Sequence, residues 1–94
     1  MNIEFLPTAY LDLRETVDFY EQHSPAVKKA FESELTDAIE IIQSFPLASR
    51  LVGPSVRKFV LRKFPHLIIY NVYPDKIIIA AIAHQHRHPR TYLR

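Results

Sequence analysis

The chain has 94 residues, of which 48% are hydrophobic and 23% are charged, and it contains no cysteine. A chain of this length supports one hydrophobic core, so we expect a single domain over residues 1–94. The lack of cysteine excludes disulfides and thiolate zinc sites, and no apolar run approaches the roughly 20 residues that cross a bilayer. No signal peptide is visible at the N-terminus. We therefore expect a cytoplasmic protein that does not interact with membranes.

Acidic and basic residues are unevenly divided along the chain. Up to Ala48 there are nine acidic and three basic residues, whereas from Ser49 onward nine basic residues accompany the single acid Asp75. This division allows one positive surface that attracts phosphate or an acidic partner segment. Alternatively, the two halves neutralise each other in the folded protein.

The first residues predict a strand followed by an amphipathic helix. Ile3 and Phe5 alternate with polar neighbours, as in a strand with one buried face, and Pro7 ends the pattern. The next segment has apolar residues at helical spacing, and Thr8 is available as the N-cap. The apolar stripe of this first helix consists of Ala9, Leu13, Val17 and Tyr20.

A second helix is expected to begin after Ser24, whose hydroxyl can cap it, with Pro25 at the first helical position. Pro46 ends this helix. Its apolar stripe consists of Val27, Phe31, Leu35, Ala38, Ile42 and Phe45. Only a few residues separate the two helical patterns, so the helices should form an antiparallel hairpin that covers one face of a sheet.

The second half of the chain predicts a loop and three strands. The loop contains the only glycine, Gly53, directly before Pro54. In VRKFVLRKF the side chains alternate between two faces. One face has Val56, Lys58, Val60 and Arg62, and the other has Arg57, Phe59, Leu61 and Lys63. The segments HLIIYNVY and KIIIAAIAH are almost wholly apolar, as central strands are, and a Pro-Asp turn joins them.

The predicted element order is therefore β-α-α-β-β-β. Helices followed by a run of strands indicate an α+β fold, in which a helical hairpin packs on a small, mainly antiparallel sheet.

The end of the chain, AHQHRHPRTYLR, is rich in histidine and arginine and suggests three kinds of site. His84, His86 and His88 would point the same way on a strand, and imidazole is a common zinc ligand. However, Pro89 ends the alternation, and no acid lies nearby in the sequence to complete a ligand set. We therefore expect no metal site.

The second possibility is RNA cleavage without a metal. Such a site needs a proton-transfer group and cations around the phosphate. Residues of these types are Arg57, Arg62, His84, His86, Arg87 and Tyr92. The same residues are equally compatible with solvated strand positions and a tyrosine packed over the sheet, because a catalytic set is recognised by its geometry. The third possibility is a binding surface. Basic residues interleaved with aromatic ones could bind nucleic acid, and a groove between helices and strands could equally dock an extended or helical peptide. The aromatic residues concerned are Phe59, Phe64, Tyr70 and Tyr73, which are also compatible with a place in the core.

Taken together, the motifs resemble those of the RelE/ParE toxin superfamily over nearly the whole chain. The first helix matches through Ala9, Asp12, Leu13, Glu15, Phe19 and Tyr20, and the second ends in the pattern I-x-x-F-P. The strand segments VRKFVLRKFPHLIIYNV and IIIAAIAHQHRHPRTY match as well. The chain is most similar to the ParE branch, the plasmid stabilisation proteins, through His84, Arg87 and Pro89, with Tyr92 where an aromatic is usual.

This resemblance implies a toxin of a type II toxin–antitoxin system that inhibits DNA gyrase without any cofactor. It also implies neutralisation by a cognate antitoxin that wraps the helices and the sheet, so that contact with DNA runs only through the antitoxin. The positions that it indicates for toxicity or target binding are Arg57, His84, Arg87 and Tyr92. A gyrase inhibitor of this kind is not an enzyme.

Two alternatives follow from the same resemblance. One is a RelE-like, ribosome-dependent mRNA endonuclease that acts without a metal. Its catalytic residues would be Arg57, Arg62, His86 and Arg87. Some of these nucleases carry a His-Tyr pair where this chain has Gln85 and His86. The other alternative is a non-toxic family member that binds an antitoxin and acts in operator autoregulation.

Overall fold

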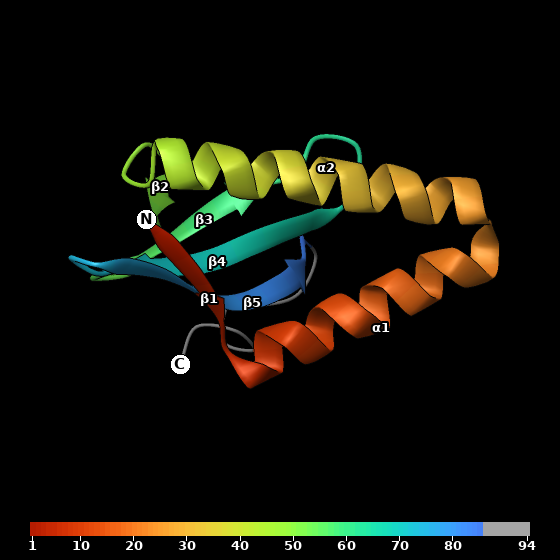
Figure 1. Cartoon of the computed structure of the whole chain (residues 1–94), viewed down its shortest axis with the longest axis horizontal. Helices are drawn as coiled ribbons and strands as arrows, with labels where there is room; N and C mark the ends of the chain where they lie inside the picture. The colour runs from red at the N-terminus through yellow and green to blue at the C-terminus, as the bar shows by residue number, and fades with distance from the viewer. Residues whose placement is uncertain (86–94) are drawn as a thin grey trace.

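The computed structural model describes residues 1–85 (Figure 1). Strand β1 spans Asn2–Phe5, and the helices α1 and α2 span Pro7–His23 and Pro25–Ser44. The strands that follow are β2 (Arg50–Leu51), β3 (Val56–Val60), β4 (His66–Val72) and β5 (Lys76–His84). Within residues 1–85 they form one five-stranded sheet in the order β1-β5-β4-β3-β2. The predicted α+β fold with a helical hairpin and a mainly antiparallel sheet is confirmed.

The sheet is an antiparallel β3-β4-β5 meander with one parallel strand at its edge. Strand β1 pairs in parallel with β5, so that Phe5 lies opposite Ile79. A register shift in the β4–β5 ladder changes the partner from Ala81, opposite Ile69, to Ile79, opposite Tyr70. This bulge leaves Ala80 of β5 unpaired and shifts the alternation by one residue, so that Ile79 and Ile82 both belong to the core on the helical side of the sheet.

Most of the core lies between the helices and one face of the sheet. The largest fully buried side chains there are Tyr70, Phe31, Ile42, Ile68, Ile77 and Ile79. The opposite face has a smaller cluster of Leu67, Ile69, Ala81 and Ala83, which are also buried. The nearly continuous apolar composition of β4 and β5 therefore reflects burial on both faces, as predicted for central strands.

The two helices begin in different ways. Helix α2 begins as predicted, because the Ser24 hydroxyl accepts a hydrogen bond from the Val27 N–H at 3.0 Å. Helix α1 begins one residue before the predicted cap Thr8, with Pro7 at its first position and no side-chain cap. The expectation that Thr8 caps this helix is wrong. Proline is suited to the first helical position, and the N–H of the preceding Leu6 already donates to the Ile79 carbonyl at 2.9 Å.

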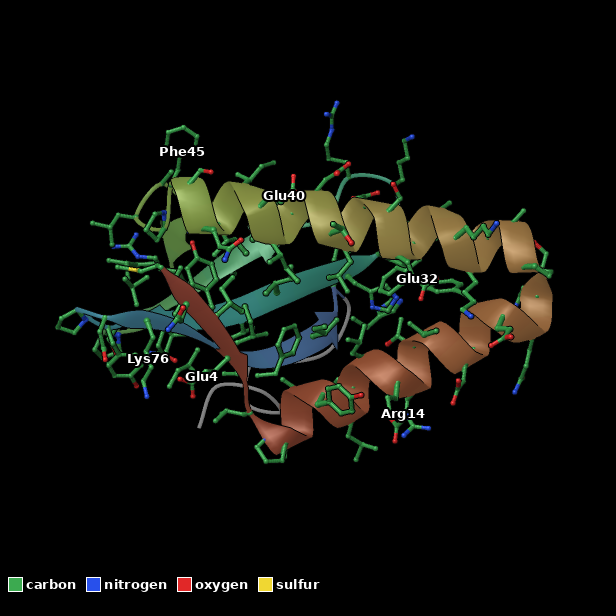
Figure 2. All side chains as sticks on the ribbon, in the orientation of Figure 1. Glu4, Arg14, Glu32, Glu40, Phe45 and Lys76 are labelled. Carbon is green, nitrogen blue, oxygen red and sulfur yellow. The ribbon has the colours of Figure 1, made fainter. Side chains whose placement is uncertain are left out.

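The segment after α2 differs most from the sequence expectation. Phe45 was expected to continue the buried stripe, but it is 65% exposed and points away from the sheet (Figure 2). The helix has ended by then, because Phe45 adopts φ −136° and ψ 65°. The expected loop also contains the two-residue strand β2, in which Arg50 pairs with Lys58 of β3.

Strand β3 ends at Val60, earlier than the alternating pattern predicted. Beyond Val60, a carboxylate of helix α2 accepts hydrogen bonds from backbone N–H groups. The side chain of Glu34 accepts hydrogen bonds from the Arg62 N–H and, at 3.0 Å, from the Lys63 N–H. Arg62 and Lys63 therefore lie in the loop before β4 and not on opposite faces of a strand. None of the helices within residues 1–85 is long and apolar enough to cross a bilayer.

Candidate functional site

His84 is the last residue of β5 and lies opposite His66, the first residue of β4. The two rings are perpendicular, with centroids 5.4 Å apart. His66 is buried, and its Nε2 shares a hydrogen bond of 2.9 Å with the Tyr20 hydroxyl of α1. The end of β5 is therefore held against helix α1 through a histidine and a tyrosine.

Aromatic rings surround this hydrogen bond. The ring of Tyr20 lies 5.2 Å from Phe31 and 5.0 Å from Phe64, and His66 lies 5.6 Å from Phe31. The Tyr20–Phe64 and Phe31–His66 pairs are edge-to-face, a geometry that aromatic rings prefer, and the Tyr20–Phe31 pair is tilted. Burial raises the pKa of Tyr20, because the charged phenolate is poorly solvated there. We call Tyr20, Phe31, Phe64 and His66 the closed end of the molecule.

A second polar link joins α1 to β5. The Asp12 carboxylate accepts a hydrogen bond from the Ile82 N–H at 3.2 Å, next to the bulge in β5. Sequence reasoning placed Asp12 in the family motif but gave it no role. The sequence did contain one sign of this contact, because Asp12 is an acid that lies beside the predicted apolar stripe, between Ala9 and Leu13. Together with the Tyr20–His66 pair, Asp12 fixes the strand end from which the chain continues toward residues 86–94.

Arg57 lies at the other end of the sheet. Its guanidinium Nη1 donates to the carbonyls of Leu47 at 3.0 Å and Ser49 at 2.7 Å. Tyr70, its cross-strand neighbour, donates its hydroxyl proton to the Pro46 carbonyl at 2.8 Å. These three hydrogen bonds fix the backbone that joins α2 to β2.

Arg62 belongs to a groove between helix α2 and the end of β3, with a volume of about 780 Å³. Its lining residues are Ala30, Ser33, Glu34, Asp37, Ala38, Ile41, Phe59, Arg62 and Lys63. Helix α2 forms one wall, and the residues around the end of β3 form the other. The groove combines an apolar floor with charged side chains at its rim.

The structure separates the predicted site residues that it describes. Arg57 lies opposite Tyr70, four positions along β4 from His66, so it is displaced from His84 by roughly 13 Å along the strand. His86, Arg87 and Tyr92 lie outside the described residues, as does His88 of the histidine set. Within residues 1–85, no three His, Asp or Glu side chains come together as metal ligands.

Comparisons with known proteins place this fold in one family. Residues 3–89 match the family model of the ParE toxin of the type II toxin–antitoxin system parDE. No curated protein matches the chain. Among solved structures, the chromosomal ParDE TA system from P. aeruginosa has a matching chain with a TM-score of 0.71 and 22% sequence identity. The match covers 89% of this chain and 95% of that chain, and it supports the shared fold. Because the family model spans nearly the whole sequence, the chain belongs to the ParE toxin family of type II toxin–antitoxin systems.

Proposed function

We propose that this ParE-family toxin inhibits DNA gyrase and that a cognate antitoxin neutralises it. The observation that carries the proposal is the family match over residues 3–89, together with the resemblance of the chain end to the ParE branch. Inhibition would occur through binding to the target, without chemistry at a site of the toxin's own. The toxin would need no cofactor for this activity.

The positions of the described cations favour inhibition over RNA cleavage. A metal-independent nuclease needs several cations and a proton-transfer group around one phosphate. Arg57 already donates to two backbone carbonyls, and Arg62 lies in the groove beside α2, beyond the end of β3. To bind one phosphate together with His84, the guanidinium of Arg57 would have to break both hydrogen bonds. It would also have to span the distance of several residues that separates the two positions along the sheet.

We propose Arg57, His84, Arg87 and Tyr92 as the residues that contribute to toxicity. His84 would act from the fixed end of β5, where His66 and Tyr20 hold the strand. Arg57 would act indirectly, by holding the 46–49 backbone in place. Arg87 and Tyr92 would meet the target directly, in keeping with their place in the basic chain end.

The test is pulse labelling of DNA and protein synthesis shortly after induction of the chain alone in a sensitive bacterial host. An early fall in DNA synthesis with an SOS response, followed by inhibition of purified gyrase in a supercoiling assay, is the expected result. An early fall in translation would instead identify a RelE-like ribosome-dependent nuclease. Growth without arrest, with the protein correctly folded, would identify a non-toxic antitoxin-binding protein.

A matched pair of substitutions tests the chain end. Arg87→Ala and Tyr92→Ala should abolish growth arrest while the thermal unfolding temperature stays unchanged. Arg14→Ala is the control, because Arg14 is an exposed arginine of helix α1 that points away from the sheet (Figure 2). If both chain-end variants remain folded and as toxic as Arg14→Ala, the chain end does not contact the target.

A further inference from the structure

The chain leaves the sheet through a single backbone hydrogen bond. Gln85, the residue after β5, donates its N–H to the Pro65 carbonyl at 2.8 Å, one position beyond the pair of His66 and His84. In an antiparallel ladder, a hydrogen-bonded pair normally exchanges two such bonds. Proline has no N–H, so the reciprocal bond to Gln85 cannot form. The direction in which the chain continues toward residues 86–94 therefore depends on where the Pro65 carbonyl is held.

Pro65 belongs to the segment 61–65 between β3 and β4, which we call the exit loop. The Leu61 N–H donates to the His66 carbonyl at 3.0 Å and closes the loop. The His66 N–H donates to the Phe64 carbonyl at 2.8 Å. This second bond is that of a γ-turn centred on Pro65, where the fixed φ of proline suits the common inverse form. The exit loop therefore presents the Pro65 carbonyl in a defined orientation.

Apolar side chains hold both sides of the exit loop to the core. Leu61 is buried, and the ring of Phe64 lies 5.0 Å from Tyr20 and 5.3 Å from Phe31. The middle of the loop, residues 62–63, consists of an arginine and a lysine that are exposed. These two residues have no apolar side chain that could anchor them to the core, so the middle of the loop needs a polar contact to be held in place.

Glu34 of helix α2 makes this contact. Its carboxylate accepts hydrogen bonds from the Arg62 N–H and, at 3.0 Å, from the Lys63 N–H. Hydrogen bonds to an ionised acceptor are stronger than those between neutral groups. The salt bridges among residues 1–85 join other side chains, so the carboxylate of Glu34 is committed to the backbone of the exit loop. Helix α2 therefore fixes the loop at the point where the core does not.

We propose that Glu34 is a positioning residue for toxicity, which acts through the exit loop on the end of the chain. Glu34 holds the middle of the loop, the loop presents the Pro65 carbonyl, and this carbonyl directs Gln85 and the residues that follow it. Glu34 itself would not touch the target. The inference rests on the part of the proposed function in which the chain end meets the target.

The first test measures toxicity. Glu34→Ala should raise the amount of chain needed to arrest growth by about fivefold or more, because the arrangement that binds the target is then populated only part of the time. Glu34→Gln keeps one acceptor oxygen without the charge and should lie between Glu34→Ala and the unchanged chain. Glu40→Ala is the control, since Glu40 is an exposed acid of the same helix (Figure 2). Equal toxicity of Glu34→Ala and Glu40→Ala would overturn the proposal.

The second test separates positioning from a general loss of stability. Amide hydrogen exchange at Gln85 should be faster by about threefold or more in the free Glu34→Ala variant, because the Pro65 carbonyl is no longer held in place. An amide at the end of a sheet exchanges by local opening, so a general loss of stability would accelerate core amides such as that of Ile68 and not that of Gln85. Unchanged exchange at Gln85 would overturn the proposal.

The third test breaks the same connection at its other end. Gln85→Pro removes the N–H that Pro65 accepts, and the preceding His84 is already in an extended strand, as a residue before proline prefers. Its toxicity should fall by a factor similar to that of Glu34→Ala. The control Gln85→Ala keeps the N–H and should stay toxic. The double variant of Glu34→Ala and Gln85→Pro should be little less toxic than either single variant, because both changes remove one connection. Factors that multiply in the double variant would overturn the proposal.

The outcomes distinguish this inference from the proposed function. If the unchanged chain arrests growth but leaves purified gyrase active, only the proposed target is refuted, because growth arrest still compares Glu34→Ala with Glu40→Ala. If Glu34→Ala is fully toxic while Arg87→Ala and Tyr92→Ala are not, the chain end meets the target but Glu34 does not position it. An unchanged chain that arrests no growth would refute both.

Discussion

The closed end differs in the burial of its apolar side chains from a second region, which we call the open edge. The open edge consists of the exposed side chains where α2 ends and β2 begins, Ile41, Phe45, Leu47 and Leu51. At the closed end, His66 is buried among aromatic rings and bonded to Tyr20. At the open edge, Phe45 and Leu47 are each 65% exposed, and Val60 pairs with Leu67 of β4 but with no strand on its other side within residues 1–85. The first region buries its aromatic side chains against one another, whereas the second leaves large apolar side chains exposed to solvent.

The comparison indicates which residues stabilise the folded chain and which contribute little to its stability. Helix α1 carries the links to the closed end, through Tyr20 to His66 and through Asp12 to Ile82. Helix α2 covers the sheet with Phe31 and Ile42, but its C-terminal turn exposes apolar groups. Substitutions at the closed end should therefore reduce the free energy of unfolding, and substitutions at the open edge should leave it nearly unchanged.

The largest expected effect is at Phe31, whose side chain is fully buried against Tyr20, Phe64 and His66. Phe31→Ala should lower the free energy of unfolding by about 3–5 kcal/mol, because it removes buried apolar surface and leaves a cavity. Urea denaturation measures the change. Phe19→Ala is the control, since Phe19 is 54% exposed and the same truncation should cost much less. Equal losses would show that the closed end has no special share in stability.

Asp12 tests the polar link between α1 and β5. Asp12→Ala should lower the free energy of unfolding by about 1–3 kcal/mol, because the partly buried Ile82 N–H loses its acceptor. Asp18→Ala removes an exposed acid of the same helix and should change stability by about 0.5 kcal/mol or less. Amide exchange at Ile82 should become faster only in Asp12→Ala, and unchanged exchange there would contradict the assigned contact.

The features that the sequence predicted are those set by local pattern. The hairpin follows from helical spacing and the Ser24–Pro25 start, and β4 and β5 follow from their apolar runs. Tertiary contacts decide the rest. Phe45 has the spacing of a buried residue but follows the end of the helix, and β3 stops where Glu34 captures two N–H groups. No local pattern could indicate that the guanidinium of Arg57 holds the carbonyls of Leu47 and Ser49.

Tyr20 gives a smaller effect with a defined pH dependence. Tyr20→Phe should lower the free energy of unfolding by about 0.5–1.5 kcal/mol at neutral pH, because it removes the hydrogen bond to His66. Burial raises the Tyr20 pKa above its usual 10.0, so the folded protein retains the phenol proton to higher pH than the unfolded chain does. This contribution is complete below the unfolded pKa and is lost as the pH rises through the folded pKa.

The corresponding measurement is urea denaturation of both proteins at several pH values. The stability difference between the unchanged chain and Tyr20→Phe should be constant from neutral pH to about pH 10 and should shrink above it. Tyr10→Phe is the control, because Tyr10 is 55% exposed on the same helix. A difference that grows above pH 10 would mean that the phenolate is favoured by the fold, contrary to the burial of the ring.

The smallest expected effect on stability is at the open edge. Phe45→Ser should change the free energy of unfolding by about 0.5 kcal/mol or less, because the ring is 65% exposed and leaves no cavity. The same substitution should raise the solubility of the free chain, because it removes a large exposed apolar group. Thermal unfolding and a solubility measurement on the free chain check the two effects. A large loss of stability would mean that Phe45 belongs to the core.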